Sequence, residues 1–303
     1  MRAVNRRFIA PVSFGLGDLV VSLPVVQAAV SQGRCSGGET WLVARSPSQA
    51  ALAERVSGLA GTLFEGDDAI EPESLVDLRD HRLQRDHWWG TSEFEAAYGP
   101  LSINEIIARI GADLGLVGDF SKPVPLEARR RPDAEGLVML VADADGAAKR
   151  WAPERWLELG EAIGRRGLRV AVVTRGEEGN PLVDGGLDGV VAATPGEAVD
   201  VLSTCRAVVG VDTGLTHIAA QQGTPTVTLS RTPAIYFRDW SHTRLVRGST
   251  CDPECRRAEK AYAYNQRVDL SGTHPAPRGC PASVGCLDAI GPASVLRTLG
   301  ELL

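Results

Sequence analysis

The stretch AVVGVDTGLTHIAA (residues 207–220), followed by GTPTVTL (residues 223–229), decides how this chain folds. An apolar run rich in valine stops at Asp212, a helical pattern starts at Gly214, and a second run of β-branched residues follows Pro225. Alternation of this kind predicts a strand, a tight turn, a helix and another strand. The sequence therefore predicts a βαβ unit at this point in the chain.

The turn of this unit has the chemistry of an anion site. The backbone amides of residues 213–216 lie at the start of the expected helix, where free N–H groups and the helix dipole favour a phosphate. His217, on the first turn of that helix, can add a ring N–H to the same anion. The plainer interpretation is that Asp212 and Thr213 cap the helix and that His217 is an ordinary half-buried histidine.

Length and composition indicate the class of protein. The chain has 303 residues, of which 44% are hydrophobic, and this suits two domains of about 150 residues each. A net charge of -6 argues against nucleic acid and against an anionic membrane surface as partners. The N-terminal arginines and apolar run resemble a signal peptide until Asp18 interrupts them, and no apolar segment reaches the ~18 residues of a membrane span. We expect a soluble, cytoplasmic protein without a transmembrane segment.

The first half of the chain alternates between strands and helices. We expect strands at residues 7–14, 40–44, 62–64 and 75–78, and helices after the turn that ends at Asp18, at residues 47–57 and at residues 102–116. Asp18 would stand at the mouth of a ligand site, although helix capping is the simpler role for it. The loop of residues 77–90 offers Trp88 and Trp89, whose flat faces suit sugar rings or bases. A solvated loop with both tryptophans in the core is the alternative.

The second half restarts the alternation after a linker at residues 117–135, which contains three prolines and an arginine run. Strands are expected at residues 137–142, 169–174 and 189–193, and helices at residues 153–167 and 195–204. Glu177 follows the second of these strands, at a position where a carboxylate can take the hydroxyls of a ribose. The pattern as a whole predicts an α/β fold.

Three motifs together resemble glycosyltransferase family 9, whose best-known members are the ADP-heptose:lipopolysaccharide heptosyltransferases. The motifs are Gly15-Leu16-Gly17-Asp18 with Leu23-Pro24, Lys149-x-Trp151 with Pro153 and Trp156, and Asp212-Thr213-Gly214-Leu215-Thr216-His217 with Ala219-Ala220. The resemblance implies a GT-B fold, in which two Rossmann-like α/β/α domains face each other across a cleft. It implies an acceptor-binding domain at residues 1–133, a nucleotide-sugar-binding domain at residues 134–290, and a final helix at residues 291–303 that packs back on the first domain.

The resemblance also assigns roles to residues. Asp18 aligns with the aspartate proposed as general base, and Lys149 aligns with a lysine near the donor phosphates. Thr213, Gly214 and His217 align with residues that hold the diphosphate, with Asp212 beside them. Glu177 is our choice for the ribose ligand, and Gly17, Arg85 and Trp88 are expected on the acceptor side.

These roles fit the chemistry of glycosyl transfer. Displacing a nucleoside diphosphate builds negative charge on the leaving phosphate and oxocarbenium character on the sugar, so the site needs hydrogen-bond donors on one side and a carboxylate on the other. Asp18 can take the proton of the acceptor hydroxyl while that oxygen attacks. Direct displacement of the nucleoside diphosphate by this oxygen inverts the anomeric centre. We expect that no cofactor or divalent metal is needed for this step.

The acceptor and the exact donor stay open at this stage. The chain is short for the family and lacks a lysine-rich N-terminal face suited to a phosphorylated lipopolysaccharide core. The acceptor could be a glycan, a lipopolysaccharide-like molecule or a small molecule, and the donor could be a nucleotide sugar other than ADP-heptose. A GT-B nucleotide-sugar epimerase or hydrolase, and a non-catalytic nucleotide-sugar-binding or metal-binding scaffold, are the alternatives.

Four of the six cysteines form a cluster, Cys251, Cys255, Cys280 and Cys286. Four thiolates can hold one structural zinc or iron ion in tetrahedral geometry. Some heptosyltransferases that modify autotransporter proteins resemble this chain in carrying a cysteine finger that binds iron. Disulfides or free thiols are the alternative to a metal site.

Overall fold

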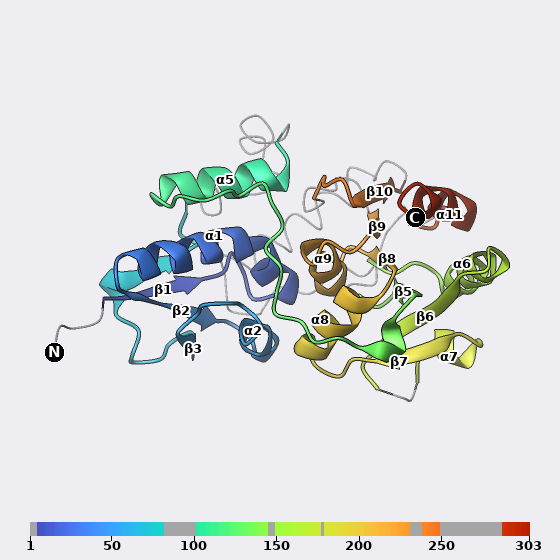
Figure 1. Cartoon of the computed structure of the whole chain (residues 1–303), viewed down its shortest axis with the longest axis horizontal. Coiled ribbons are helices and arrows are strands. Elements are labelled where there is room, and N and C mark those ends of the chain that lie inside the picture. The colour runs from blue at the N-terminus through green and yellow to red at the C-terminus, as the bar shows by residue number, and fades with distance from the viewer. Residues whose placement is uncertain (1–4, 82–100, 145–148, 177–178, 231–237, 249–286) are drawn as a thin grey trace, which may run out of the picture. The chain divides into compact units, whose positions relative to one another are not determined.

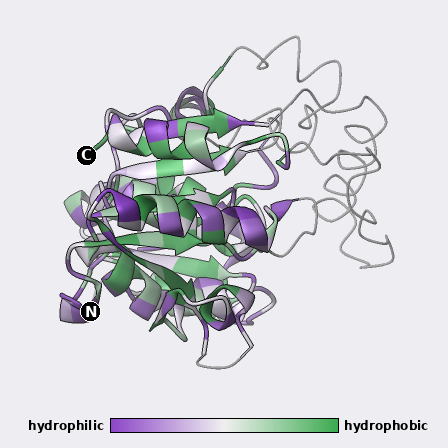
Figure 2. Cartoon of the chain, turned by 90° about the vertical axis from the view of Figure 1, so that its right-hand side faces the viewer, coloured by the Kyte–Doolittle hydropathy of each residue, from purple (hydrophilic) through white to green (hydrophobic). Residues whose placement is uncertain are grey.

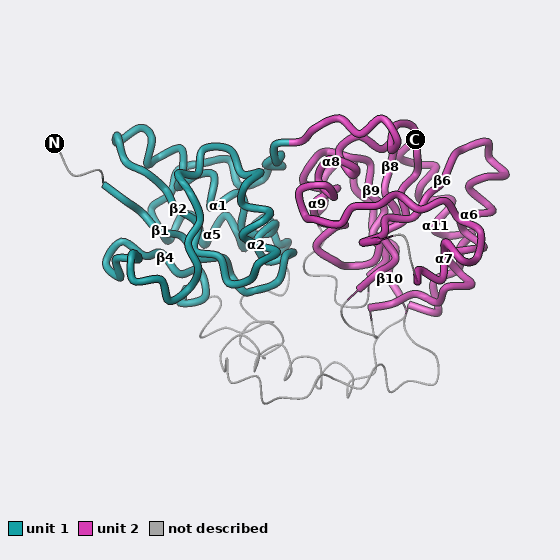
Figure 3. The backbone as a smooth tube through the Cα atoms, turned by 90° about the horizontal axis from the view of Figure 1, so that it is seen from below, with its two compact units in different colours: residues 1–127, 260–274 teal, residues 128–259, 275–303 magenta. Residues whose placement is uncertain are grey.

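The structure is a computed structural model, and it describes residues 5–81, 101–144, 149–176, 179–230, 238–248 and 287–303. The chain divides into two compact units, and the boundary between them lies between Glu127 and Ala128 (Figure 3). This boundary falls inside the linker expected at residues 117–135, slightly before the division at residue 133 that the motifs suggested. Each unit has its own parallel β-sheet with helices beside it, so the α/β class is confirmed.

The first unit is built on a four-stranded parallel sheet with strand order β3-β2-β1-β4. Figure 1 labels β1, β2 and β3 of this sheet. Its elements are β1 Arg6–Ala10, α1 Leu16–Cys35, β2 Glu39–Ala44, α2 Pro47–Ala53, β3 Gly61–Phe64, the short 3-10 helix Pro72–Ser74, β4 Leu75–Asp77 and α5 Ile103–Asp113. Helix α5 packs beside α1 and buries Ile103, Ile106, Ile107 and Ile110, which are spaced so that they share one helix face.

The second unit is built on a six-stranded parallel sheet with strand order β10-β9-β8-β5-β6-β7. Its elements are the 3-10 helix Pro132–Ala134, β5 Leu137–Val141, α6 Pro153–Arg165, β6 Arg169–Thr174, α7 Pro181–Asp184, β7 Asp188–Val191, α8 Pro195–Thr204, β8 Ala207–Val211, α9 Gly214–Gln221, β9 Thr226–Ser230, β10 Thr243–Arg247 and α11 Pro292–Gly300. The expected βαβ unit is β8-α9-β9. From β5 the chain runs outward through β6 and β7, and it then returns to the other side of β5 with β8. The boundary between β5 and β8 is therefore the switch point of the sheet.

The core of the second unit explains its apolar strands. Strands β5 and β8 lie in the middle of the sheet and are buried along their whole length, as continuous apolar runs in parallel sheets are. Figure 2 shows the hydrophobic colour concentrated on the strands, whereas the helices carry hydrophilic residues beside hydrophobic ones. Within this core Trp151 and Trp156 meet edge to face, with their ring centroids 5.0 Å apart. These two rings join the segment after β5 to helix α6.

Within the second unit, the final helix α11 packs against α6, β9 and β10. The reason is its apolar face, because Val295 and Leu299 are almost completely buried in the same core as Trp156 and Leu159. Among the described residues, no helix has both the length and the apolar character that crossing a membrane requires.

Candidate active site

The candidate site lies at the carboxyl edge of the second sheet, where β5 and β8 are neighbours. Asp212 follows the last residue of β8 directly, and Lys149 comes from the segment that follows β5. Because both strands are parallel, their carboxyl ends meet at one edge, and ligands of such sheets bind in the crevice at the switch point. The topology therefore brings together two residues that are far apart in the sequence.

Helix α9 begins at this edge with Thr213 as its N-cap residue. The cap has extended backbone geometry, but its side chain makes no capping hydrogen bond. Its hydroxyl oxygen Oγ1 is buried and has no hydrogen-bond partner. A buried polar atom without a partner requires a physical explanation, and a ligand or an ordered water at the helix N-terminus would supply one. The N–H groups of the first helical turn also have no intrahelical partner.

Gly210 in β8, which no sequence motif singled out, determines where this helix packs. A Cβ atom at Gly210 in β8 would lie 2.9 Å from the Cβ atom of Val141 and closer still to the hydroxyl of Thr216 on α9. Thr216 itself donates a hydrogen bond of 2.6 Å to the carbonyl of Val211. The absence of a side chain at Gly210 therefore lets α9 pack directly on the strand, and this contact fixes the N-terminus of the helix at the sheet edge.

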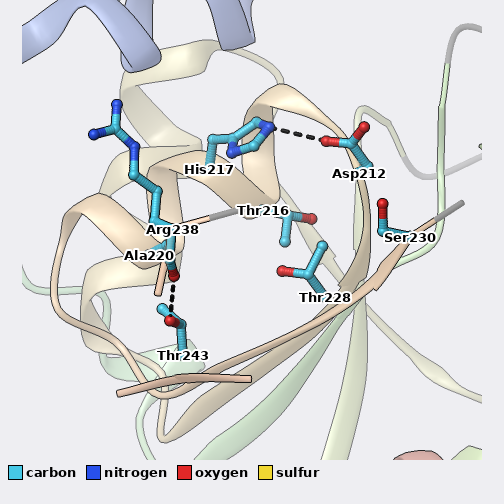
Figure 4. A pocket seen from close by; sticks show the side chains of 8 residues that line it. All are labelled: Asp212, Thr216, His217, Ala220, Thr228, Ser230, Arg238 and Thr243. Carbon is cyan, nitrogen blue, oxygen red and sulfur yellow. Dashed lines mark hydrogen bonds and ion pairs between the residues drawn. The ribbon is translucent and has the colours of Figure 1, made fainter. Parts of the chain in front are cut away.

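Three charged or titratable side chains meet at the N-terminus of α9, and Figure 4 shows two of them, Asp212 and His217. The Nε2 atom of His217 lies 3.0 Å from Oδ1 of Asp212, and the Nζ atom of Lys149 lies 3.4 Å from Oδ2 of the same carboxylate. Burial favours the neutral form of this carboxyl group, but Lys149 and His217 outweigh burial and hold the pKa of Asp212 well below its usual range. Asp212 is therefore an ionised carboxylate that holds two potential cations beside the helix N-terminus.

A pocket lined mainly by residues with polar side chains continues from this cluster along α9 toward β9 and β10 (Figure 4). It is lined by Asp212, Thr216, His217, Ala220, Thr228, Ser230, Arg238 and Thr243. Arg238 is only 3% exposed, and burial lowers the pKa of its guanidinium to about 10. No sequence pattern predicts a role for Arg238, because it lies in no motif and in no segment with a clear strand or helix pattern.

Asp18 lies on the first turn of α1 in the first unit, and it has the capping role that was the alternative at the sequence level. Its Oδ2 atom accepts a hydrogen bond of 3.0 Å from the N–H of Gly15. The buried side chain of Gln49 donates to the carbonyls of Ser13 and Gly15, at 2.8 and 2.9 Å. These bonds fix the turn between β1 and α1, and Gly17 lies half-buried in the first turn of α1.

The structure thus brings together Lys149, Asp212, Thr213, Gly214 and His217, and it has Gly17 and Asp18 at the equivalent edge of the other unit. The remaining candidates lie outside the described residues: Arg85, Trp88, Glu177, Cys251, Cys255, Cys280 and Cys286. Within the described part of the chain, no group of three or more histidine, cysteine, aspartate or glutamate side chains could hold a metal ion.

A Rossmann-like strand order with a helix N-terminus and two potential cations at its switch point is typical of nucleotide-binding α/β proteins. The comparison with family models gives the family. The model described as glycosyltransferase family 9 (heptosyltransferase) matches residues 116–264, so this part of the chain belongs to that family and the protein is a glycosyltransferase. The resemblance seen in the motifs is confirmed.

Solved structures agree with this fold along the whole chain. A glycosyltransferase family 9 protein from Veillonella parvula is 14% identical with a TM-score of 0.65, covering 100% of this chain and 98% of its own. The E. coli heptosyltransferase WaaC with ADP is 15% identical with a TM-score of 0.64, covering 99% of this chain and 100% of its own. The iron-containing dodecameric glycosyltransferase TibC from enterotoxigenic E. coli is 17% identical with a TM-score of 0.66, covering 99% of this chain and 76% of its own. No curated protein sequence matches the chain.

Proposed function

We propose that this glycosyltransferase moves a heptose from ADP-heptose to a hydroxyl acceptor with inversion at the anomeric carbon. The observation that carries the proposal is the Asp212 carboxylate with Lys149 and His217 around it, at the N-terminus of α9 and at the switch point of the sheet. The solved structures support ADP-heptose as the donor, since WaaC is described with ADP and TibC with ADP-D-β-D-heptose.

The donor side of the reaction needs groups that stabilise the leaving diphosphate. The ammonium group of Lys149, the ring of His217, the unpartnered hydroxyl of Thr213 and the first amides of α9 are all at one edge. Groups fixed before the reaction stabilise developing charge without reorganisation, so they lower the barrier. Asp212 is itself an anion and repels a phosphate. Its role in the donor site is to hold the side chains of Lys149 and His217 in place. Glu177, which follows β6 in the sequence, is our candidate for the ribose hydroxyls.

The acceptor side is proposed to lie in the first unit, with the two units facing each other as in a GT-B enzyme. Asp18 then accepts the proton of the acceptor hydroxyl as that oxygen attacks the anomeric carbon. The capping bond to Gly15 occupies one lone-pair site of a carboxylate that has about four. Gly17, Arg85 and Trp88 complete the proposed acceptor side. The acceptor itself is proposed only as a hydroxyl compound such as a glycan or a lipopolysaccharide-like molecule.

The test is ligand binding followed by turnover. Melting temperatures are measured with ADP, UDP, GDP, dTDP and ADP-heptose, since a ligand at about a hundredfold its Kd stabilises the folded state by about 2.7 kcal/mol. Selective stabilisation by ADP and ADP-heptose supports the proposed donor, whereas a response to another nucleotide alone contradicts it. Turnover of donor without acceptor would favour an epimerase or hydrolase, and binding without any turnover would favour a scaffold.

The assay also includes EDTA. The proposed step uses no divalent metal, yet Asp143 and Asp145 in the segment after β5 form an Asp-x-Asp pair, and such carboxylates can bind Mg²⁺ together with substrate phosphates. Activity that survives EDTA supports the metal-free step. Loss of activity that added Mg²⁺ restores would contradict it.

A further inference from the structure

The hydrogen bond between Asp212 and His217 determines which ring nitrogen of His217 carries a hydrogen. Asp212 is ionised, and an ionised carboxylate has no hydrogen to donate, so it can only accept. Its partner at 3.0 Å is the Nε2 atom of His217. Nε2 therefore carries the hydrogen in both charge states of the ring.

This fixed tautomer limits what the other ring nitrogen can do. In the neutral ring with a hydrogen on Nε2, the Nδ1 atom holds a lone pair and is an acceptor. A lone pair directed at a phosphate oxygen is repulsive. Only the imidazolium form, which has a second hydrogen on Nδ1, can donate to a diphosphate while the bond to Asp212 remains.

We propose that Asp212 is a positioning residue that fixes the Nε2–H tautomer of His217, so that the site binds the donor diphosphate with His217 as an imidazolium. The inference rests on the proposed function, because it concerns how the same site holds its nucleoside diphosphate. Its consequence is a linkage between ligand and proton. When the free ring is neutral, binding of the diphosphate takes up one proton from solution at Nδ1.

Some charged groups around His217 favour the protonated form of its ring and others oppose it. Among the described residues, Asp212 favours the imidazolium, whereas Lys149, which shares the same carboxylate, and Arg238, which lines the same pocket, oppose it. A bound diphosphate adds negative charge beside these groups and shifts the balance toward the imidazolium. The proton then stays on Nδ1 while negative charge grows on the leaving phosphate, and no proton transfer is required.

The first test measures proton uptake. ADP is titrated into the protein calorimetrically at pH 8, in two buffers with different ionisation enthalpies, because the terminal phosphate of ADP is then already ionised. We expect the wild type to take up protons when ADP binds, since the bound ring must carry a hydrogen on both nitrogens. His217→Gln is the control, and we expect it to bind ADP more weakly and without uptake.

The decisive variant is Asp212→Asn. An asparagine amide can donate to Nε2, which moves the hydrogen of the neutral ring to Nδ1 and allows the neutral ring to donate to the phosphate. We therefore expect Asp212→Asn to bind ADP at pH 8 without proton uptake. A merely structural role for Asp212 would weaken binding and leave the uptake unchanged, and that result would overturn the inference.

A second measurement does not depend on the ADP affinity of any variant. Nitrogen-15 NMR of the histidine rings in the ligand-free wild type at high pH reports the tautomer, and His217 is assigned by its absence in His217→Gln. An Nε2–H tautomer supports the inference, and an Nδ1–H tautomer overturns it. ADP binding without proton uptake overturns this inference alone. Failure of every nucleoside diphosphate to bind overturns the proposed function as well.

Discussion

Gly210 and Thr216 are in such close contact that the strand can carry no side chain at this position. A Cβ atom at residue 210 would overlap with the hydroxyl oxygen of Thr216. This hydroxyl donates a hydrogen bond to the Val211 carbonyl. The strand and the first turn of α9 therefore share one rigid contact. Because the candidate anion site is the N-terminus of α9, this packing contact sets the position of the site.

The first prediction concerns this contact. We expect Gly210→Ala to lower the free energy of unfolding by about 1–3 kcal/mol, because the methyl group overpacks the interface between strand and helix. Replacing Thr216 by Ala as well should recover part of the loss, since the two side chains then no longer collide.

Gly164→Ala in α6 is the control. Nothing lies within 4 Å of a Cβ at Gly164, so this helical substitution should stabilise by about 0.5–1 kcal/mol. Urea unfolding measures these three variants and the single variant Thr216→Ala, and additive losses in the double variant would contradict the contact.

The second prediction compares two tryptophans of one core. The indole N–H of Trp151 donates to the Ile290 carbonyl at 3.1 Å, whereas the indole N–H of Trp156 is buried without a partner. Replacing either ring by Phe removes similar volume, but only Trp151→Phe removes a hydrogen bond. We expect Trp151→Phe to be less stable than Trp156→Phe by about 1 kcal/mol.

The same pair of variants tests the link to the site. Trp151 lies two residues after Lys149, so loss of its anchor should loosen the segment that holds the ammonium group. ADP affinity should therefore fall in Trp151→Phe and stay close to wild type in Trp156→Phe, as isothermal titration calorimetry can measure. Equal ADP affinities in the two variants would show that the anchor does not position Lys149.

Sequence patterns predicted the local parts of this fold because they act over short distances. The apolar run that ends at Asp212 and the glycine that follows Thr213 specify a strand, a turn and a helix without reference to the rest of the chain. The strand expected at residues 7–14 ends at Ala10, because Pro11 has no N–H group for the sheet. Such boundaries depend on single residues that the sequence displays directly.

Contacts between residues that are far apart in the sequence were harder to predict from it. The meeting of Lys149 with Asp212 follows from β5 and β8 being neighbours, and strand order is a property of the whole sheet. The final helix shows the same limit, since Val295 and Leu299 indicate a buried face but not which core buries it. Arg238 became a candidate only when the pocket was visible, because a single arginine before an unassigned strand has no distinguishing pattern.

The third prediction concerns acid stability. The pKa of Asp212 is lowered in the folded state, so its ion pairs contribute stability above the unfolded pKa, about 3.9, and this contribution is lost as the pH falls toward the folded value. Asp212→Asn should be less stable than the wild type at pH 7, by about 2 kcal/mol. Below about pH 4 the difference should shrink, because protonation of Asp212 removes the ion pairs. Urea unfolding between pH 3 and pH 5 measures it, and a difference that grows as the pH falls from 4 to 3 would contradict the sign.

The fourth prediction concerns the cysteines. Cys205 is buried, and burial raises the pKa of its thiol to about 12, whereas Cys35 is exposed. Iodoacetamide at pH 8 should modify Cys35 in the folded protein and Cys205 only after denaturation, because the thiolate is the reactive form. Mass spectrometry of the peptides measures both sites. Rapid modification of Cys205 in the folded state would contradict its burial.

The proposed metal at Cys251, Cys255, Cys280 and Cys286 is tested on the same samples. Elemental analysis of the purified protein should find about one iron or zinc ion per chain, as four thiolates bind one ion. Cys251→Ser should lower the metal content and Cys35→Ser should leave it unchanged. A protein without metal that forms disulfides, or in which all four thiols react freely, would contradict a metal site.

The last prediction separates the two roles of Asp18. As a cap, its Oδ2 atom accepts the N–H of Gly15, and the side-chain oxygen of an asparagine can do the same. As a general base, only the carboxylate can take the acceptor proton. Asp18→Asn should therefore keep the stability of α1, whereas Asp18→Ala should lose about 1 kcal/mol.

Both Asp18 variants should lose activity, by about 10²- to 10⁴-fold in kcat, and both should bind ADP with the affinity of the wild type. Lys149→Met serves as the contrast, because it should weaken ADP binding through the loss of a cation at the diphosphate. Steady-state kinetics and calorimetry on the three variants distinguish these effects. If Asp18→Asn kept a kcat near that of the wild type, Asp18 would only cap α1, and the base would have to be sought elsewhere in the chain.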